Sequence, residues 1–189
     1  METGELIFVT GGVRSGKSSF AEEYAASEAN TKAGNLHYIA TSKPADEEMV
    51  NRIKRHQRDR ERSGTAWKTW EWPVDLHEIV PHFKQSDIVL LDCLTILLSN
   101  ELFRYKDPGE SCDKKKIYDA IIDGIVQLTN VVNTLIIVSN EVLTEPMSDE
   151  KVVKSYSHLL GKLHQAMVNR AEKAYLVEAG IPILKKERP

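Results

Sequence analysis

The segment Gly11–Ser18, Gly-Gly-Val-Arg-Ser-Gly-Lys-Ser, has the residue types and the spacing of a phosphate-binding loop. Glycines let a backbone curl so that several N–H groups point at phosphate oxygens. The Lys17 ammonium can reach the β- and γ-phosphates of a nucleotide, and the Ser18 hydroxyl can bind Mg²⁺. An apolar run precedes the loop and a helical pattern follows it, which favours this interpretation over a chance glycine-rich turn. The nucleotide-binding residues predicted here are Gly11, Gly12, Val13, Arg14, Ser15, Gly16, Lys17 and Ser18.

A second acidic group is expected beside the metal, at the carboxyl end of a neighbouring strand. The apolar run Ile88–Leu91 ends in Asp92, which we interpret as a ligand of a magnesium-bound water, with helix capping as the alternative. Ser139-Asn140-Glu141 ends another apolar run. Because parallel strands bring their carboxyl ends to one edge, Asn140 and Glu141 are expected in the same crevice, as ligand contacts or as loop anchors.

Residues 52–62 form a basic segment, with six basic and two acidic side chains, a net charge of +4. Arg52, His56 and Arg60 recur every four residues, so they share one face if the segment is helical. A solvated basic helix with an incidental histidine is one interpretation, and nucleic-acid binding is a weaker one. A third is phosphate chemistry, because neighbouring cations favour the neutral, nucleophilic imidazole and stabilise charge on a phosphorus under attack.

Short apolar runs alternate with helical patterns along the chain, which predicts an α/β fold with a mainly parallel sheet flanked by helices. The strands are expected at Leu6–Val9, Leu36–Ala40, Ile88–Leu91, Leu135–Val138 and, more weakly, Ala174–Val177. The helices are expected at Lys17–Ala29, Asp46–Arg60, Lys114–Asn130 and Asp149–Lys173. Residues 61–73, which contain three tryptophans, and residues 104–113 are predicted to be surface excursions.

The chain has 189 residues, of which 41% are hydrophobic and 28% charged, so we expect a single globular domain over 1–189. No apolar run approaches the roughly 20 residues of a membrane span. The net charge of −3 argues against a nucleic-acid partner. Cys93 and Cys112 have no disulfide or zinc pattern, and no signal peptide is visible, so a cytoplasmic protein is expected.

Several motifs together resemble the bifunctional adenosylcobinamide kinase/adenosylcobinamide-phosphate guanylyltransferase family of cobalamin biosynthesis. They are Val9–Ser18, Tyr38–Ser42, Asp46–Met49 with Arg52, Ile53 and His56, Trp67–Thr69 with Glu71, and Ser139–Val142. The resemblance covers most of the chain and is most specific from residue 6 to 92.

The resemblance implies a three-layer RecA-like P-loop domain, usually a homotrimer, that uses ATP and GTP with Mg²⁺. The family phosphorylates the aminopropanol hydroxyl of adenosylcobinamide and then transfers GMP from GTP to the new phosphate through a guanylylated histidine, which His56 matches. The resemblance also implies that Lys17 of the loop is catalytic. Outside the loop, the family's nucleotide contacts match Ala40, Thr41, Ser42, Gln57, Arg58, Asp59, Arg60, Glu71 and Asp92. The metal ligands of the family match Ser18 and Asp92.

The chain departs from the family pattern late in the sequence, at Leu143–Pro146, Lys154–His158 and His164-Gln165. A single-activity paralogue and a P-loop kinase with another acceptor therefore remain alternatives. A nucleotide-switched regulator of nucleic acid is a third, and it predicts salt-sensitive binding through the basic segment.

Overall fold

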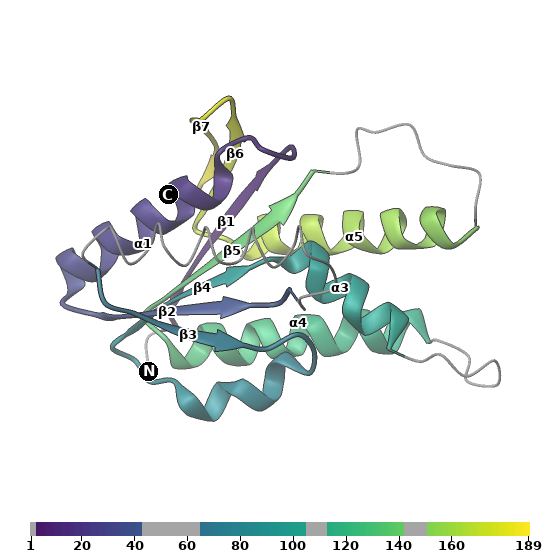
Figure 1. Ribbon diagram of the computed structural model, residues 1–189, viewed down its shortest axis with the longest axis horizontal. Coiled ribbons are helices and arrows are strands. Elements are labelled where there is room, and N and C mark those ends of the chain that lie inside the picture. Colours follow the sequence, from purple (N-terminus) through teal and green to yellow (C-terminus); the bar gives the residue numbers. More distant parts are fainter. Residues whose placement is uncertain (1–2, 43–64, 105–112, 142–150) are drawn as a thin grey trace.

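The computed structural model describes residues 3–42, 65–104, 113–141 and 151–189, except for the side chains of Lys151 and Val152. Its seven described strands form one sheet in the order β3-β2-β4-β5-β1-β6-β7 (Figure 1). Neighbouring strands are parallel except for the last pair, β6 and β7. The strands are β1 (Glu5–Gly11), β2 (Asn35–Ala40), β3 (Trp67–Glu71), β4 (Asp87–Asp92), β5 (Thr134–Asn140), β6 (Lys173–Glu178) and β7 (Ile181–Glu187).

Helices cover both faces of this sheet, as Figure 1 shows. Helix α1 (Lys17–Lys32) lies on one face, and a 3₁₀ helix η1 (Leu76–His82) with α3 (Leu94–Phe103), α4 (Lys114–Val131) and α5 (Lys151–Arg170) lies on the other. Alternate side chains of each central strand enter different cores. In β1, Leu6 and Phe8 pack toward the α3–α5 side, and Ile7 and Val9 pack toward α1. The continuous apolar runs are therefore explained, because both faces of the parallel sheet are buried.

The strands predicted from the five apolar runs are confirmed, as is the α/β class. The predicted helices at Lys17–Ala29 and Lys114–Asn130 are also confirmed. The first continues to Lys32 and ends where Ala33 adopts a left-handed conformation with φ of +50°. The helix predicted at Asp46–Arg60 lies outside the described residues, as does most of the excursion predicted at 104–113.

The prediction of a surface excursion over 61–73 is wrong for Trp67–Glu71, which form the edge strand β3 beside β2. The apolar pattern did not predict this strand, because only Trp67 and Trp70 are partly buried and the other three residues are exposed. Trp70 packs against His37 and Phe83 beneath the sheet edge. Its bulk therefore serves core packing.

The predicted helix at Asp149–Lys173 is too long, because α5 ends at Arg170 and Lys173 begins β6. Besides β3, three further elements, η1, α3 and β7, were not predicted. The last follows β6 through a two-residue turn, Ala179-Gly180, in which both φ angles are positive (+50° and +81°). These angles are those of a type I′ hairpin turn, which usually carries asparagine or glycine at its first position. Alanine at that position concealed the hairpin.

Candidate functional site

The phosphate-binding loop connects the carboxyl end of β1 to the amino end of α1, as predicted. Its backbone is curled, with positive φ angles at Arg14 (+60°) and Gly16 (+90°). The Lys17 side chain folds back across the loop, where its ammonium donates a hydrogen bond of 3.0 Å to the Gly12 carbonyl oxygen. A largely buried ammonium, curled backbone amides and a helix N-terminus thus converge on one small region.

The turn between β6 and β7 holds this loop in place. The Gly180 N–H donates a 2.8 Å hydrogen bond to the Ser15 carbonyl oxygen. A Cβ on Gly16 would lie 3.1 Å from the Gly180 Cα, and one on Gly11 would lie 2.5 Å from the Val177 carbonyl oxygen. Glycine is therefore needed at Gly11 for packing, and at Gly16 both for the close approach of Gly180 and for its positive φ.

The loop also contains an unsatisfied polar atom. Within the described residues the Ser15 Oγ is buried and has no hydrogen-bond partner. Buried hydroxyls in native structures nearly always have a partner, so this atom fits a loop that receives the oxygen atoms of a ligand.

Asp92 lies at the carboxyl end of β4, two strands from β1 on the same edge of the sheet. Its Oδ2 accepts a 2.8 Å hydrogen bond from the Tyr38 hydroxyl, and its side chain is partly exposed. The described residues contain no group of three or more His, Cys, Asp or Glu side chains that could hold a metal ion. Mg²⁺ typically takes one or two protein oxygens and completes its shell with phosphates and water, and Ser18 and Asp92 fit that requirement.

The residue after Asp92 is a buried cysteine, Cys93, joined to it by a cis peptide bond. Burial, together with the nearby Asp92 charge, raises the pKa of the Cys93 thiol to about 12. The thiol therefore stays protonated at neutral pH and does not serve as a nucleophile.

Thr41 connects the end of β2 to the end of β4. Its hydroxyl donates to the Cys93 carbonyl oxygen at 2.9 Å and accepts from the Cys93 N–H at 2.8 Å. Its own N–H donates to the Asp92 carbonyl oxygen. The Asn100 amide of α3 donates both to the Thr41 carbonyl oxygen and to that of Pro73. Thr41 is fully buried and its polar groups are engaged within the protein. Its nucleotide contact stays a prediction. The hydrogen bonds favour a different role for Thr41, which is to position the ends of β2 and β4.

Glu71 lies at the carboxyl end of β3, beside Ala40, and it is exposed. Four strand spacings separate β3 from β1, roughly 19 Å across the sheet. Ala40, Ser42, Glu71 and Asp92 thus border the same sheet edge as the loop, with Glu71 at its far end. His56, Gln57, Arg58, Asp59 and Arg60 lie outside the described residues, so their predicted roles stay predictions.

A buried series of hydrogen bonds, not predicted from the sequence, connects the end of β5 to α3 and α5. The Asn140 N–H donates to Thr95 Oγ1 at 2.8 Å, Thr95 and Ser139 hydroxyls lie 2.9 Å apart, and Ser139 Oγ lies 2.8 Å from His164 Nε2. Burial lowers the pKa of His164 to about 4, so the ring is neutral. In the tautomer that carries its proton on Nδ1, Nε2 accepts from the Ser139 hydroxyl, and Ser139 in turn accepts from the Thr95 hydroxyl.

These hydrogen bonds give a structural role to two of the late segments that depart from the family pattern. His164 lies on α5, and Tyr156, two turns earlier on the same helix, donates from its hydroxyl to the Thr95 carbonyl oxygen at 3.0 Å. The spacing of eight residues on one helix face was the available signal. Nothing in the sequence pointed to Thr95 or Asn100, because their partners are distant along the chain.

Comparison with known proteins identifies the family. Residues 7–184 match the sequence model of the family described as cobinamide kinase / cobinamide phosphate guanyltransferase. The chain belongs to this family. It is 31% identical over 186 residues to the bifunctional adenosylcobalamin biosynthesis protein CobU of Escherichia coli K12, covering 94% of this chain and 98% of that one. It is 32% identical over 183 residues to the corresponding CobP protein of Pseudomonas aeruginosa PAO1, covering 96% and 97%.

The predicted family resemblance is therefore confirmed. This member of the cobinamide kinase/guanylyltransferase family is a bifunctional enzyme of adenosylcobalamin biosynthesis, and its substrates are cobinamide compounds and nucleotides. No helix among the described residues of the enzyme is long and apolar enough to cross a membrane.

Solved structures confirm the fold of this family member independently. A KaiC-like protein from Pyrococcus horikoshii OT3 superposes with a TM-score of 0.52 at 14% identity, covering 100% of this chain and 81% of that one. At that identity the likeness concerns the fold alone, and it supports the predicted RecA-like arrangement of a mainly parallel sheet between helices.

Proposed function

We propose that the loop Gly11–Ser18 binds the triphosphate of the nucleotide substrate. The observation that carries the proposal is the position of the loop, at the carboxyl edge of a parallel sheet with Lys17 folded over it and the buried Ser15 hydroxyl unpaired. In this arrangement the Lys17 ammonium exchanges the Gly12 carbonyl oxygen for phosphate oxygens. The loop amides and the N-terminus of α1 stabilise the negative charge that shifts between phosphates during transfer.

Ser18 and Asp92 are proposed to hold Mg²⁺, the first directly and the second through water. When bound, the ion neutralises phosphate charge and orients the phosphates for attack. Tyr38 orients the Asp92 carboxylate through its 2.8 Å hydrogen bond, which leaves the other carboxylate oxygen for a magnesium-bound water. Ala40, Thr41, Ser42 and Glu71 are proposed to border the nucleoside, because they lie at the same sheet edge.

His56 is proposed as the guanylyl acceptor. An imidazole nitrogen of His56 attacks the α-phosphorus of GTP, the bond to the β-phosphate oxygen breaks, and pyrophosphate leaves. A phosphate oxygen of adenosylcobinamide-phosphate then attacks the same phosphorus, and the phosphorus–nitrogen bond breaks to release the histidine. Gln57, Arg58, Asp59 and Arg60 are proposed as nucleotide contacts beside it, with support from the family resemblance. In the kinase step the aminopropanol hydroxyl of adenosylcobinamide attacks the γ-phosphorus of ATP or GTP and loses its proton, the bond from that phosphorus to the β–γ bridging oxygen breaks, and ADP or GDP leaves.

Labelling tests the histidine. Wild-type protein is incubated with GTP labelled at the α-phosphorus and with Mg²⁺, and acid-labile, base-stable label on the protein is measured. His56→Ala is expected to take up none, whereas His77→Ala, which removes an exposed histidine of η1, is expected to match the wild type. Label on His56→Ala equal to the wild type excludes His56 as the acceptor.

The wider organisation is also proposed. The whole chain, 1–189, is one nucleotide-binding domain, because a single sheet includes strands from residue 5 to residue 187. The enzyme assembles as a homotrimer, for which exposed Ile181, Ile183 and Leu184 on the edge strand β7 offer an apolar contact surface. Sedimentation analysis tests the trimer, and a monomer at micromolar concentration contradicts it. The enzyme is proposed to act in the cytoplasm, where its nucleotide substrates are made, and without a nucleic-acid partner.

A further inference from the structure

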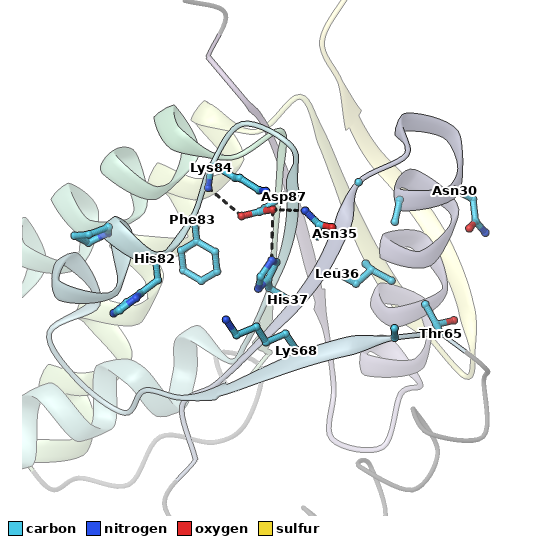
Figure 2. A pocket seen from close by; sticks show the side chains of 14 residues that line it. Asn30, Asn35, Leu36, His37, Thr65, Lys68, His82, Phe83, Lys84 and Asp87 are labelled. Carbon is cyan, nitrogen blue, oxygen red and sulfur yellow. Dashed lines mark hydrogen bonds and ion pairs between the residues drawn. The ribbon is translucent and has the colours of Figure 1, made fainter.

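A pocket of about 840 Å³ opens at the amino ends of β2 and β4 (Figure 2). Asn35 and Asp87, which line it, are the first residues of these two strands. The phosphate-binding loop follows the carboxyl end of β1, so about 17 Å of strand length separates the two edges. The pocket is therefore distinct from the nucleotide crevice, and its volume is within the usual range of small-molecule sites.

The floor of the pocket is a carboxylate that the protein already satisfies. Asp87 is only 2% exposed, and its oxygens accept 2.9 Å hydrogen bonds from the Asn35 side-chain amide and from the Lys84 backbone N–H (Figure 2). His37 Nε2 lies 3.5 Å from the same carboxylate. Asp87 is also the one carboxylate among the described residues that line the pocket. The carboxylate oxygens of Asp87 are thus hydrogen-bonded within the protein and are not directed at a ligand in the pocket.

The imidazole of His37 forms a neutral wall. The Trp70 indole N–H donates a 3.1 Å hydrogen bond to His37 Nδ1, so that nitrogen carries no proton and the proton lies on Nε2, toward Asp87. Burial lowers the pKa of His37, and the charges of Lys68 and Lys84 lower it further. Asp87 opposes this shift, and the exposed His82 lies on the same side of the pocket.

Two lysines supply positive charge at the rim. The Lys68 ammonium lies 4.2 Å from the centre of the Trp70 ring, and the Lys84 main chain is fixed by its bond to Asp87. Neither ammonium forms an ion pair with a carboxylate in the part of the chain that the structure describes. Both side chains border the pocket in Figure 2, together with the apolar surfaces of Leu36 and Phe83.

We propose that this pocket binds a small phosphate-bearing organic molecule, with Lys68 and Lys84 as counter-charges and Phe83, on the same face of the sheet as His37, against its apolar part. Lysine ammonium groups suit phosphate, because they act as compact point charges with several donors. The Asn35 and Asn30 side chains add polar partners at the rim. The site is independent of the transfer chemistry at the opposite edge.

Phenyl phosphate is the probe, and phenol is the control that lacks the charge. Binding is measured by calorimetry on Lys17→Ala protein, in which the phosphate-binding loop is disabled. Saturable binding of phenyl phosphate, but not of phenol, is expected. Lys68→Gln/Lys84→Gln in this background should weaken it at least tenfold, and Lys115→Gln/Lys185→Gln, which removes two exposed lysines elsewhere, should leave it unchanged.

The ring resonances of His37 provide a local readout by NMR, and they should shift on addition of phenyl phosphate with the same saturation curve. Absence of saturable binding in the Lys17→Ala background overturns the proposal. Equal weakening by both lysine pairs also overturns it, because the effect would then be general charge attraction. Nucleotide binding to the wild type is measured separately, so a failure at this pocket is distinguishable from a failure at the loop.

Discussion

His164 should make the stability of the enzyme depend on pH. Burial lowers its pKa from the ordinary 6.5 to about 4, and its Nε2 lies 2.8 Å from the Ser139 hydroxyl oxygen. Between these two pKa values the unfolded chain binds a proton that the folded protein does not bind. Stability is therefore complete above pH 6.5 and falls as the pH decreases toward 4. The full loss is about 3 kcal/mol, of which about 2 kcal/mol is reached by pH 5.

The assay is urea unfolding of wild type and His164→Gln from pH 7.5 to pH 5. Glutamine offers an oxygen to the Ser139 hydroxyl but does not titrate, so the free energy of unfolding of the variant should lack this pH-dependent loss. The difference between the two proteins should shrink by about 2 kcal/mol at pH 5. His158→Gln, at an exposed position of the same helix, should stay parallel to the wild type. If the difference in unfolding free energy between wild type and His164→Gln is constant over this range, His164 is not the group whose titration lowers the stability.

Three further predictions concern the loop and its supports. Thr95→Val removes a buried hydroxyl and leaves the Asn140 N–H unpaired, so it should cost about 2 kcal/mol in urea unfolding; the control Thr129→Val, which loses only a bond to a helical carbonyl, should cost under about 0.5 kcal/mol. Lys17→Met should lower kinase turnover at least about 100-fold with an unchanged circular dichroism spectrum, and near-normal turnover would contradict the role of the ammonium. Gly180→Ala should cost about 1 kcal/mol, because a φ of +81° disfavours L residues although the surrounding space is open, and an unchanged melting temperature would contradict this.

Local signals predicted the elements that depend on short stretches of chain. The loop Gly11–Ser18 is recognisable because the phosphate binding proposed for it needs glycines, a lysine and a hydroxyl at set spacings within a short stretch of backbone. The four central strands β1, β2, β4 and β5 are recognisable because both faces of a parallel sheet require apolar residues, and the half-buried β6 gave a weaker run. The strand β3 was missed for the opposite reason, since an edge strand with three exposed residues carries no continuous apolar run.

The fold class, the position of the loop Gly11–Ser18 and the family could all be predicted from the sequence, because each depends on residue types at close spacing. The contacts between side chains across the sheet, in contrast, depend on the three-dimensional arrangement of the strands and helices. Thr95 reaches Ser139 and Asn140, Asn100 joins Thr41 to Pro73, and Gly180 holds the phosphate-binding loop, in each case between residues at least 27 positions apart. Such contacts follow from the order of the strands and the placement of the helices. That arrangement depends on the whole chain, because it is stabilised by the burial of the two apolar cores. No local sequence pattern predicts these contacts, because each partner, taken alone, is an ordinary polar residue or glycine.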